Sequence, residues 1–283
     1  LHYVSGARIP VVMAVVNRAA SPPWTIFLDH QHTIQARDTG WIQLYVENAQ
    51  EALDTTIQAF KIAEDPSILT PIMICSDAFV LSHTSELVEV PEQEMVDLFL
   101  PEYNPEFVLD IDKPLTLCVG TPPSLYMEFK IRQQRAINRS VEKIKIVTEE
   151  FGKFFGRYWP GVLERYGAED AETVLIAVGS LCGTIKEVVD ELNQEGYKVA
   201  LIRIRSYRPF PVIELTENLR GVKTVGVFDR DLSFGYNGAI YTDVKGAIYG
   251  KLNPMPQVIN YVGGLGGRDV NINEIKSIYF NLL

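Results

Sequence analysis

A run of mostly apolar residues leads directly into two polar side chains. Residues 8–17 read Arg-Ile-Pro-Val-Val-Met-Ala-Val-Val-Asn, and Arg18 follows at once. Such a run is typical of a strand buried on both faces of a parallel sheet, and open α/β sheets bind ligands beyond the carboxyl ends of their strands. Asn17 and Arg18 are therefore predicted to bind substrate, because a guanidinium suits a carboxylate or phosphate. An ion pair between Arg18 and a carboxylate of its own domain remains the alternative.

A second polar group, Asp29-His30-Gln31-His32, lies a few residues further along. A metal site on Asp29, His30 and His32 is disfavoured, because the histidines stand two residues apart and a polar loop that hydrogen-bonds its own backbone explains them. Asp29, His30 and Gln31 stay candidates for lining a site or a subunit contact. No catalytic residue and no metal ligand is assigned.

Glycine-rich stretches follow two predicted strands, at residues 179–183 and 263–267. Neither contains the G-x-G-x-x-G fingerprint of a dinucleotide site, so both are predicted to be tight turns. The cysteines, Cys75, Cys118 and Cys182, are too few and too scattered to hold an iron–sulfur cluster or structural zinc. Free thiols favour a cytoplasmic location.

Strand and helix signals alternate along the chain. Strands are predicted at 8–17, 41–47 and 68–79, and Asn48 and Glu51 predict a capping box for a helix between the last two. Residues 90–123 are rich in Pro and acidic residues, which predicts an extended connector, followed by a helix at 126–155. Four further strands are predicted at 173–178, 199–204, 224–228 and 258–262, with helices after the first three, and Gly196 is expected at the C′ position of the first.

This alternation of strands and helices predicts two open, mostly parallel α/β domains joined by an extended and helical linker. Their bounds are predicted at 1–90, 91–172 and 173–283. The 283 residues carry 36 Asp and Glu against 26 Lys and Arg, a net charge of −10, which disfavours nucleic acid as a partner. No apolar run reaches the length that a bilayer requires, so no membrane span is expected.

Several segments together resemble the alpha subunit of pyruvate:ferredoxin oxidoreductase, a member of the 2-oxoacid:ferredoxin oxidoreductases. The resemblance runs over essentially the whole chain, and the combination is specific although each piece alone is weak. The segments are residues 8–18, 29–31, 37–43 (Arg-Asp-Thr-Gly-Trp-Ile-Gln), 48–52, 207–211 (Tyr-Arg-Pro-Phe-Pro) and 263–269 (Gly-Gly-Leu-Gly-Gly-Arg-Asp).

The resemblance implies a thiamine diphosphate enzyme of anaerobic metabolism, an oxidoreductase that decarboxylates a 2-oxoacid, with pyruvate favoured. The products are an acyl-CoA and carbon dioxide, coenzyme A is the co-substrate, and electrons pass to ferredoxin. The cofactor is then shared with a beta subunit, while Mg²⁺ and iron–sulfur clusters belong to partner subunits, including gamma and delta. The two domains become a pyrimidine-binding thiamine domain and a transketolase C-terminal-like domain. Arg18 matches the family's arginine for the substrate carboxylate.

The chain also departs from the family pattern. A Tyr-Pro-Ile-Thr-Pro-Ser-like motif and the glutamate that activates the cofactor do not occur, so the first domain is expected to lack its N-terminal stretch. The amino-acid sequence of residues 22–26 is not the commonest one in the family, which leaves 2-oxoglutarate and branched-chain 2-oxoacids as alternative substrates. A non-catalytic scaffold or assembly subunit is the other alternative, because fold alone does not fix activity.

Overall fold

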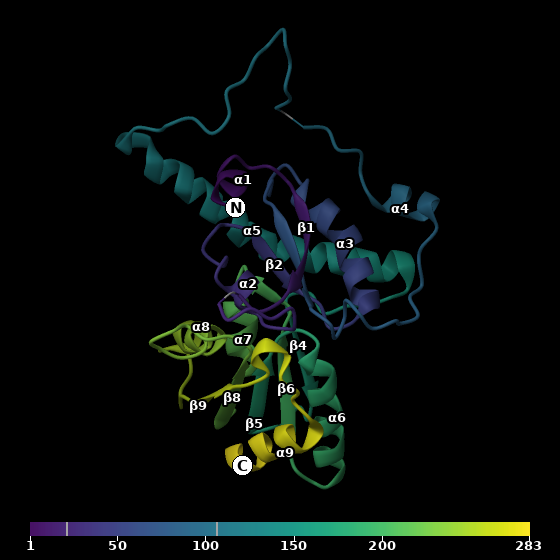
Figure 1. Ribbon diagram of the computed structural model, residues 1–283, viewed down its shortest axis with the longest axis vertical. Helices are drawn as coiled ribbons and strands as arrows, with labels where there is room; N and C mark the ends of the chain where they lie inside the picture. Colours follow the sequence, from purple (N-terminus) through teal and green to yellow (C-terminus); the bar gives the residue numbers. More distant parts are fainter. Residues whose placement is uncertain (21, 106) are drawn as a thin grey trace.

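Two β-sheets organise the chain in the computed structural model, which describes residues 1–20, 22–105 and 107–283 (Figure 1). The first sheet has the order β1-β3-β2-β7. Its first three strands are parallel and β7 is antiparallel to β2. The strands are β1 (Val12–Asn17), β3 (Ile72–Asp77), β2 (Ile42–Tyr45) and β7 (Ser206–Arg208).

The helices α3 (Ala49–Ala63) and α5 (Pro123–Phe155) cover one face of the first sheet, and their apolar side chains form one core with those of β2 and β3. Asn48 caps α3 as predicted, because its side chain accepts the Glu51 N–H. The predicted capping box is wrong in its second half. The Glu51 carboxylate instead accepts the Glu47 N–H and pairs with two arginines.

The second sheet has the order β4-β6-β5-β8-β9, parallel except for β4. Two helices pack on each face, because β5, β6 and β8 are apolar on both. The strands are β4 (Leu163–Gly167), β6 (Val199–Ile204), β5 (Thr173–Ala177), β8 (Thr224–Asp229) and β9 (Gln257–Val262). The helices are α6 (Leu181–Gln194) and α9 (Ile272–Leu282) on one face, and α7 (Val212–Asn218) and α8 (Ala239–Ile248) on the other.

The two sheets share a core. The rings of Tyr45 in β2 and Tyr207 in β7 lie 6.1 Å apart, and both belong to a buried cluster that continues onto the second sheet. Gly196 follows α6 with φ +95°, as its predicted C′ position requires. The predicted α/β class with mostly parallel sheets is confirmed, while the domain bounds at 90 and 172 stay predictions.

Several elements were not predicted from the sequence, namely α1 (His2–Gly6), α2 (Gln31–Ile34), α4 (Gln93–Phe99), β4, β7, α9 and the 3-10 turn η1 (Leu265–Gly267). The helix α4 contradicts the fully extended connector predicted for 90–123. It forms because Phe99 is buried against Phe151 of α5, with ring centroids 5.5 Å apart. Within the described residues, no helix is both long and apolar enough to cross a membrane.

Candidate functional site

The carboxyl ends of β1 and β3 meet at one edge of the first sheet. Asn17 and Asp77 are the last residues of these strands, they are paired in register, and both are buried. The Thr33 hydroxyl donates a 2.8 Å hydrogen bond to Asn17 Oδ1. Arg18 follows directly and is exposed, so the sheet presents this guanidinium at the edge where α/β proteins bind ligands.

Asp77 is the centre of the buried polar groups at this edge. His30 Nε2 lies 2.9 Å from Asp77 Oδ1, and the N–H and hydroxyl of Ser180 donate to Asp77 Oδ2 at 2.9 and 2.6 Å. Burial alone would raise the pKa of Asp77, but the neighbouring His30, Arg230 and Ser180 lower it to about 2. The carboxylate therefore stays ionised and ties the first sheet to the start of α6.

The turn before α6 must approach this carboxylate closely. Gly179 has φ +72°, and a Cβ there would lie 2.8 Å from Asp77 Oδ2. The predicted turn is confirmed at Gly179 and Ser180, whereas residues 181–183 already belong to α6. Gly179 is required both by the left-handed backbone and by the contact with Asp77.

The end of β8 contributes three buried charged residues, Asp229, Arg230 and Asp231. The Arg230 carbonyl accepts the His30 N–H at 2.9 Å. Asp229 accepts the Ile240 N–H of α8 at 2.8 Å. Burial raises the pKa of both Asp229 and Asp231. The charge of Asp231 raises the pKa of Asp229 further, whereas the hydrogen bond with Asp229 and the nearby His30 partly offset the rise at Asp231, so the pair titrates as a unit.

We name Asn17, His30, Asp77, Arg230 and Asp231 the strand-end cluster. Five of its buried polar atoms find no hydrogen-bond partner among the residues that the structure describes: Asn17 Nδ2, His30 Nδ1, Arg230 Nε and Nη1, and Asp231 Oδ1. Arg230 Nη1 lies 3.8 Å from Asp77 Oδ2, beyond hydrogen-bond distance. Buried polar groups are normally satisfied, so such a concentration marks a place for water or a ligand.

The loop that carries Arg18 is held from both sides. The Ala19 N–H donates to the Phe27 carbonyl at 3.1 Å, and the Phe27 ring lies 4.3 Å from that of Phe79. From the second half of the chain, the Gly267 N–H donates to the Leu28 carbonyl at 2.7 Å. A Cβ on Gly267 would lie 2.4 Å from the Phe27 side chain, so the predicted tight turn at 263–267 is confirmed and explained by this contact.

The candidates from the sequence separate into two kinds. Arg18 is exposed and forms no ion pair with any described carboxylate, whereas Asn17, Asp29 and His30 are buried and Gln31 is half-buried. Asp29 accepts the Gln31 N–H at 2.8 Å, so this segment does hydrogen-bond its own backbone. Burial and the nearby positive charge of Arg18 lower the pKa of His32.

Four residues at this edge were not predicted as site residues from the sequence, namely Asp77, Ser180, Arg230 and Asp231. The position at the carboxyl end of a parallel strand, which pointed to Arg18, could also have identified these residues, because each ends or follows such a strand. What the sequence does not show is that strand ends from two different sheets face one another.

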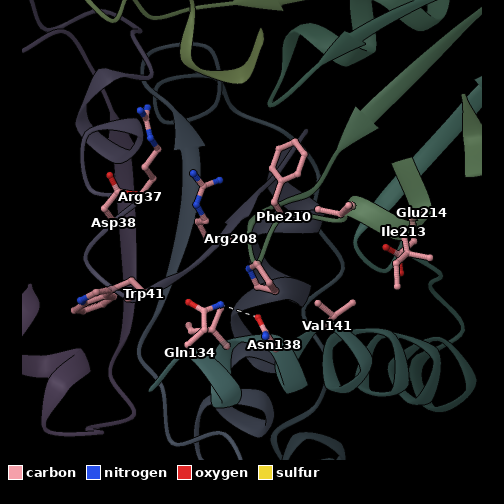
Figure 2. Close-up of a pocket in the computed structure, with 14 residues that line it drawn as sticks. Arg37, Asp38, Trp41, Gln134, Asn138, Val141, Arg208, Phe210, Ile213 and Glu214 are labelled. Atoms are coloured by element: carbon pink, nitrogen blue, oxygen red, sulfur yellow. Dashed lines mark hydrogen bonds between the residues drawn. The ribbon is translucent and has the colours of Figure 1, made fainter. Parts of the chain in front are cut away.

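A separate pocket of about 580 Å³ lies between α5, the turn at 37–41 and the residues after β7 (Figure 2). Arg208 on its wall is fixed by a 2.8 Å bond to Asp243, and Gln134 donates to Asn138 at its floor. Residues of the 37–43 segment and of the Tyr-Arg-Pro-Phe-Pro segment at 207–211 line this pocket together. Neither Arg18 nor a member of the strand-end cluster lines it, so we base the site on the strand ends instead.

A thiamine diphosphate site needs groups that bind the substrate and groups that hold the metal-bound diphosphate. The residues described here fit the first requirement. The exposed Arg18 and the incompletely bonded cluster that includes its neighbour Asn17 suit the substrate side of such a site. For the metal that accompanies a diphosphate, the described residues offer no group of three His, Cys, Asp or Glu side chains, and Gly-Asp-Gly does not occur in the sequence. The diphosphate half does not fit this chain.

Comparison with known proteins agrees with this fold. Residues 1–149 match the family model "Pyruvate flavodoxin/ferredoxin oxidoreductase, thiamine diP-bdg", and residues 171–275 match "Pyruvate:ferredoxin oxidoreductase core domain II". Pyruvate synthase subunit PorA of Methanocaldococcus jannaschii is 46% identical over 98% of this chain and 71% of its own length. Ketoisovalerate oxidoreductase subunit VorA of Pyrococcus abyssi is 43% identical over 98% and 70%.

Among solved structures, the fold is similar to 2-oxoglutarate:ferredoxin oxidoreductase from Magnetococcus marinus, which was solved with 2-oxoglutarate, coenzyme A and succinyl-CoA bound. The TM-score is 0.66 at 14% identity, over 99% of this chain and 50% of that one. A split-gene transketolase gives a TM-score of 0.50 at 13% identity, over 96% of this chain and 66% of that one. At these identities the likeness concerns the fold alone.

The matched family models and the named relatives define the class of protein, a subunit of a thiamine diphosphate-binding oxidoreductase. The chain belongs to the pyruvate:ferredoxin oxidoreductase family, and its relatives are the alpha-type subunits PorA and VorA. The family resemblance and the oxidoreductase class predicted from the sequence are both confirmed.

Proposed function

We propose that this chain is the substrate-binding subunit of a 2-oxoacid:ferredoxin oxidoreductase and that Arg18 binds the carboxylate of the oxoacid. The observation that carries the proposal is the exposed guanidinium, without a described carboxylate partner, at the carboxyl end of β1. A carboxylate ligand would supply the two acceptors that a planar guanidinium fork matches.

Asn17 and the loop of Asp29, His30 and Gln31 position this guanidinium. Thr33 fixes Asn17, and His30 is locked between Asp77 and the Arg230 carbonyl. Bound thiamine diphosphate would supply the nucleophilic carbon and the electron sink for decarboxylation. This chain would orient the oxoacid and exclude water with the aromatic side chains of the Arg18 loop, Trp24 and Phe27.

We further propose that the cofactor is shared with a beta subunit that holds the diphosphate and its Mg²⁺. Iron–sulfur clusters and the ferredoxin contact would then belong to gamma and delta subunits, with coenzyme A as co-substrate. The absence of Gly-Asp-Gly from the sequence supports this division. Its three free cysteines fit a cytoplasmic complex.

Calorimetry tests the division of the site. The full chain alone is expected to bind thiamine diphosphate with Mg²⁺ weakly, and addition of the diphosphate-holding subunit is expected to produce tight binding. Tight, Mg²⁺-dependent binding by this chain alone would show that it holds the diphosphate itself.

We favour pyruvate as the substrate, with branched-chain 2-oxoacids second and 2-oxoglutarate third. The relatives include both pyruvate synthase and ketoisovalerate oxidoreductase subunits at similar identity. The test is kcat/KM of the assembled complex with each acid, followed through ferredoxin reduction. A higher value for ketoisovalerate would replace pyruvate, and no oxidation of any 2-oxoacid by the assembled complex would favour a scaffold subunit.

A further inference from the structure

The segment between α4 and α5 leaves the body of the molecule. We name residues 100–105 and 107–122 the arm, and Figure 1 shows it projecting beyond the first sheet before it returns to α5. Its described residues from 101 to 121 form no backbone–backbone hydrogen bond with another described residue. They nevertheless carry exposed apolar side chains: Tyr103, Phe107, Val108, Leu109, Ile111, Leu115, Leu117 and Val119.

The composition of the arm fits an extended segment that binds a surface. Leu109 and Ile111 are 88% and 95% exposed, which is costly in water unless a partner covers them. Four prolines, at 101, 105, 114 and 122, restrict the backbone to extended conformations and lower the entropy lost on binding. Glu102, Asp110 and Asp112 against Lys113 make the described part acidic.

The first half of α5 has the opposite charge. Its residues from Pro123 to Arg132 are unburied, and Leu125, Tyr126, Met127, Phe129 and Ile131 are exposed. Lys130, Arg132, Arg135 and Arg139 are exposed between 123 and 139, against one acid, Glu128. Arg132 and Arg135 pair with no described carboxylate. This face is therefore apolar and basic, where the arm is apolar and acidic.

We propose that the arm of one copy lies on the first half of α5 of a second copy, and that the arm of the second copy lies on the first half of α5 of the first. The end of the arm already lies near its own α5, because Cys118 and Thr121 line one hollow with Tyr126 of that helix. The exchange therefore concerns the part of the arm before Cys118, and Figure 1 shows the arm projecting beyond the first sheet before it returns to α5. Reciprocal exchange gives a closed two-fold dimer in which the same contact occurs twice. It also gives a local attraction that opposes the repulsion between two chains of net charge −10.

Cross-linking from the tip of the arm tests which surface it touches. Cys75 and Cys182 are buried and Cys118 is exposed, so Ile111→Cys with Cys118→Ser creates a single exposed thiol for a benzophenone maleimide. The full chain, with any subunit that co-purifies, is mixed from ¹⁴N- and ¹⁵N-labelled preparations. Cross-links between isotopes to residues 125–135 are expected. Cross-links only within one chain, or to a different subunit, would overturn the proposal.

Charge reversal gives an independent measurement. Arg132→Glu with Arg135→Glu is expected to weaken the dimer about tenfold or more in sedimentation equilibrium. Adding Asp110→Lys and Asp112→Lys should restore it. The matched control, Lys153→Glu with Lys223→Glu, makes the same charge change at exposed sites elsewhere and should leave the dimer unchanged. An equal effect of the control, or no rescue, would contradict arm exchange.

Discussion

Two buried polar clusters join the sheets of this protein, and they differ in how completely their atoms are bonded. We name Glu51, Arg203 and Arg205 the arginine network. Arg205 donates to Glu51, Thr55 and the Gly161 carbonyl at 2.8–2.9 Å. Arg203 pairs with Glu51 and with Glu47. In the described structure only Arg203 Nε of this network lacks a partner.

The strand-end cluster is equally buried but leaves five atoms unbonded among the described residues. The difference indicates that the two clusters have different roles, one structural and one in the site. A saturated ion network holds the two sheets in register, because a buried charge is tolerated only when paired. An unsaturated cluster that includes the neighbour of an exposed arginine keeps bonding capacity for water or a ligand, which is expected of a site.

The largest effect is expected from breaking the arginine network. Glu51→Gln leaves two buried guanidinium groups without their shared carboxylate, which should lower the free energy of unfolding by about 3–5 kcal/mol. Urea unfolding followed by circular dichroism measures it. The control Glu142→Gln, at a carboxylate that is 71% exposed, should change stability by less than about 0.5 kcal/mol. Similar small effects of both variants would remove the structural role of the network.

A smaller loss is expected at the centre of the strand-end cluster. Asp77→Asn removes a carboxylate whose pKa is lowered to about 2, which should cost about 2 kcal/mol at pH 7. Because the folded pKa lies below the ordinary value, this contribution is full above pH ~4 and disappears as pH falls toward 2. The difference between wild type and variant should therefore shrink over that range. A difference independent of pH would assign the effect to packing.

The carboxyl pair at the end of β8 should show the opposite dependence on pH. Burial raises the pKa of Asp229 and Asp231, so the folded state binds more protons and stability falls as pH rises above the ordinary carboxyl value of about 4. Asp231→Asn removes one of the two like charges. We expect the decline between pH 5 and 8 to shrink by about 1 kcal/mol, and an unchanged slope would show that the carboxyls do not share a proton.

The sequence predicted what depends on local pattern. The buried strands β3, β5, β6 and β8, the Asn48 cap and the turns at 179 and 263–267 follow from apolar runs, side-chain capping and glycine chemistry. The prediction that residues 8–17 are buried on both faces is wrong, because β1 is an edge strand in which Ala14 and Val16 are exposed. Prediction from the sequence failed where tertiary contacts decide. The Glu51 carboxylate forms ion pairs with Arg203 and Arg205 instead of a hydrogen bond to its expected capping partner. The helix α4 forms because Phe99 packs against Phe151 of α5.

The candidate site shows the same limit. Arg18 and Asn17 were accessible from the sequence because a single strand end defines them. The partners of His30 were not, because Asp77 lies on another strand and Arg230 on another sheet. A pattern within one segment cannot report which segments meet.

The central claim, that function resides at the unsaturated strand ends, is tested most directly at Arg18. Arg18→Ala should have the smallest effect on stability of these variants, since the side chain is exposed. In the assembled complex it should lower kcat/KM for the 2-oxoacid by roughly 10- to 150-fold, the value of a charged hydrogen bond. Arg18→Lys should recover only part of this loss. An unchanged kcat/KM in a folded Arg18→Ala complex would contradict the account.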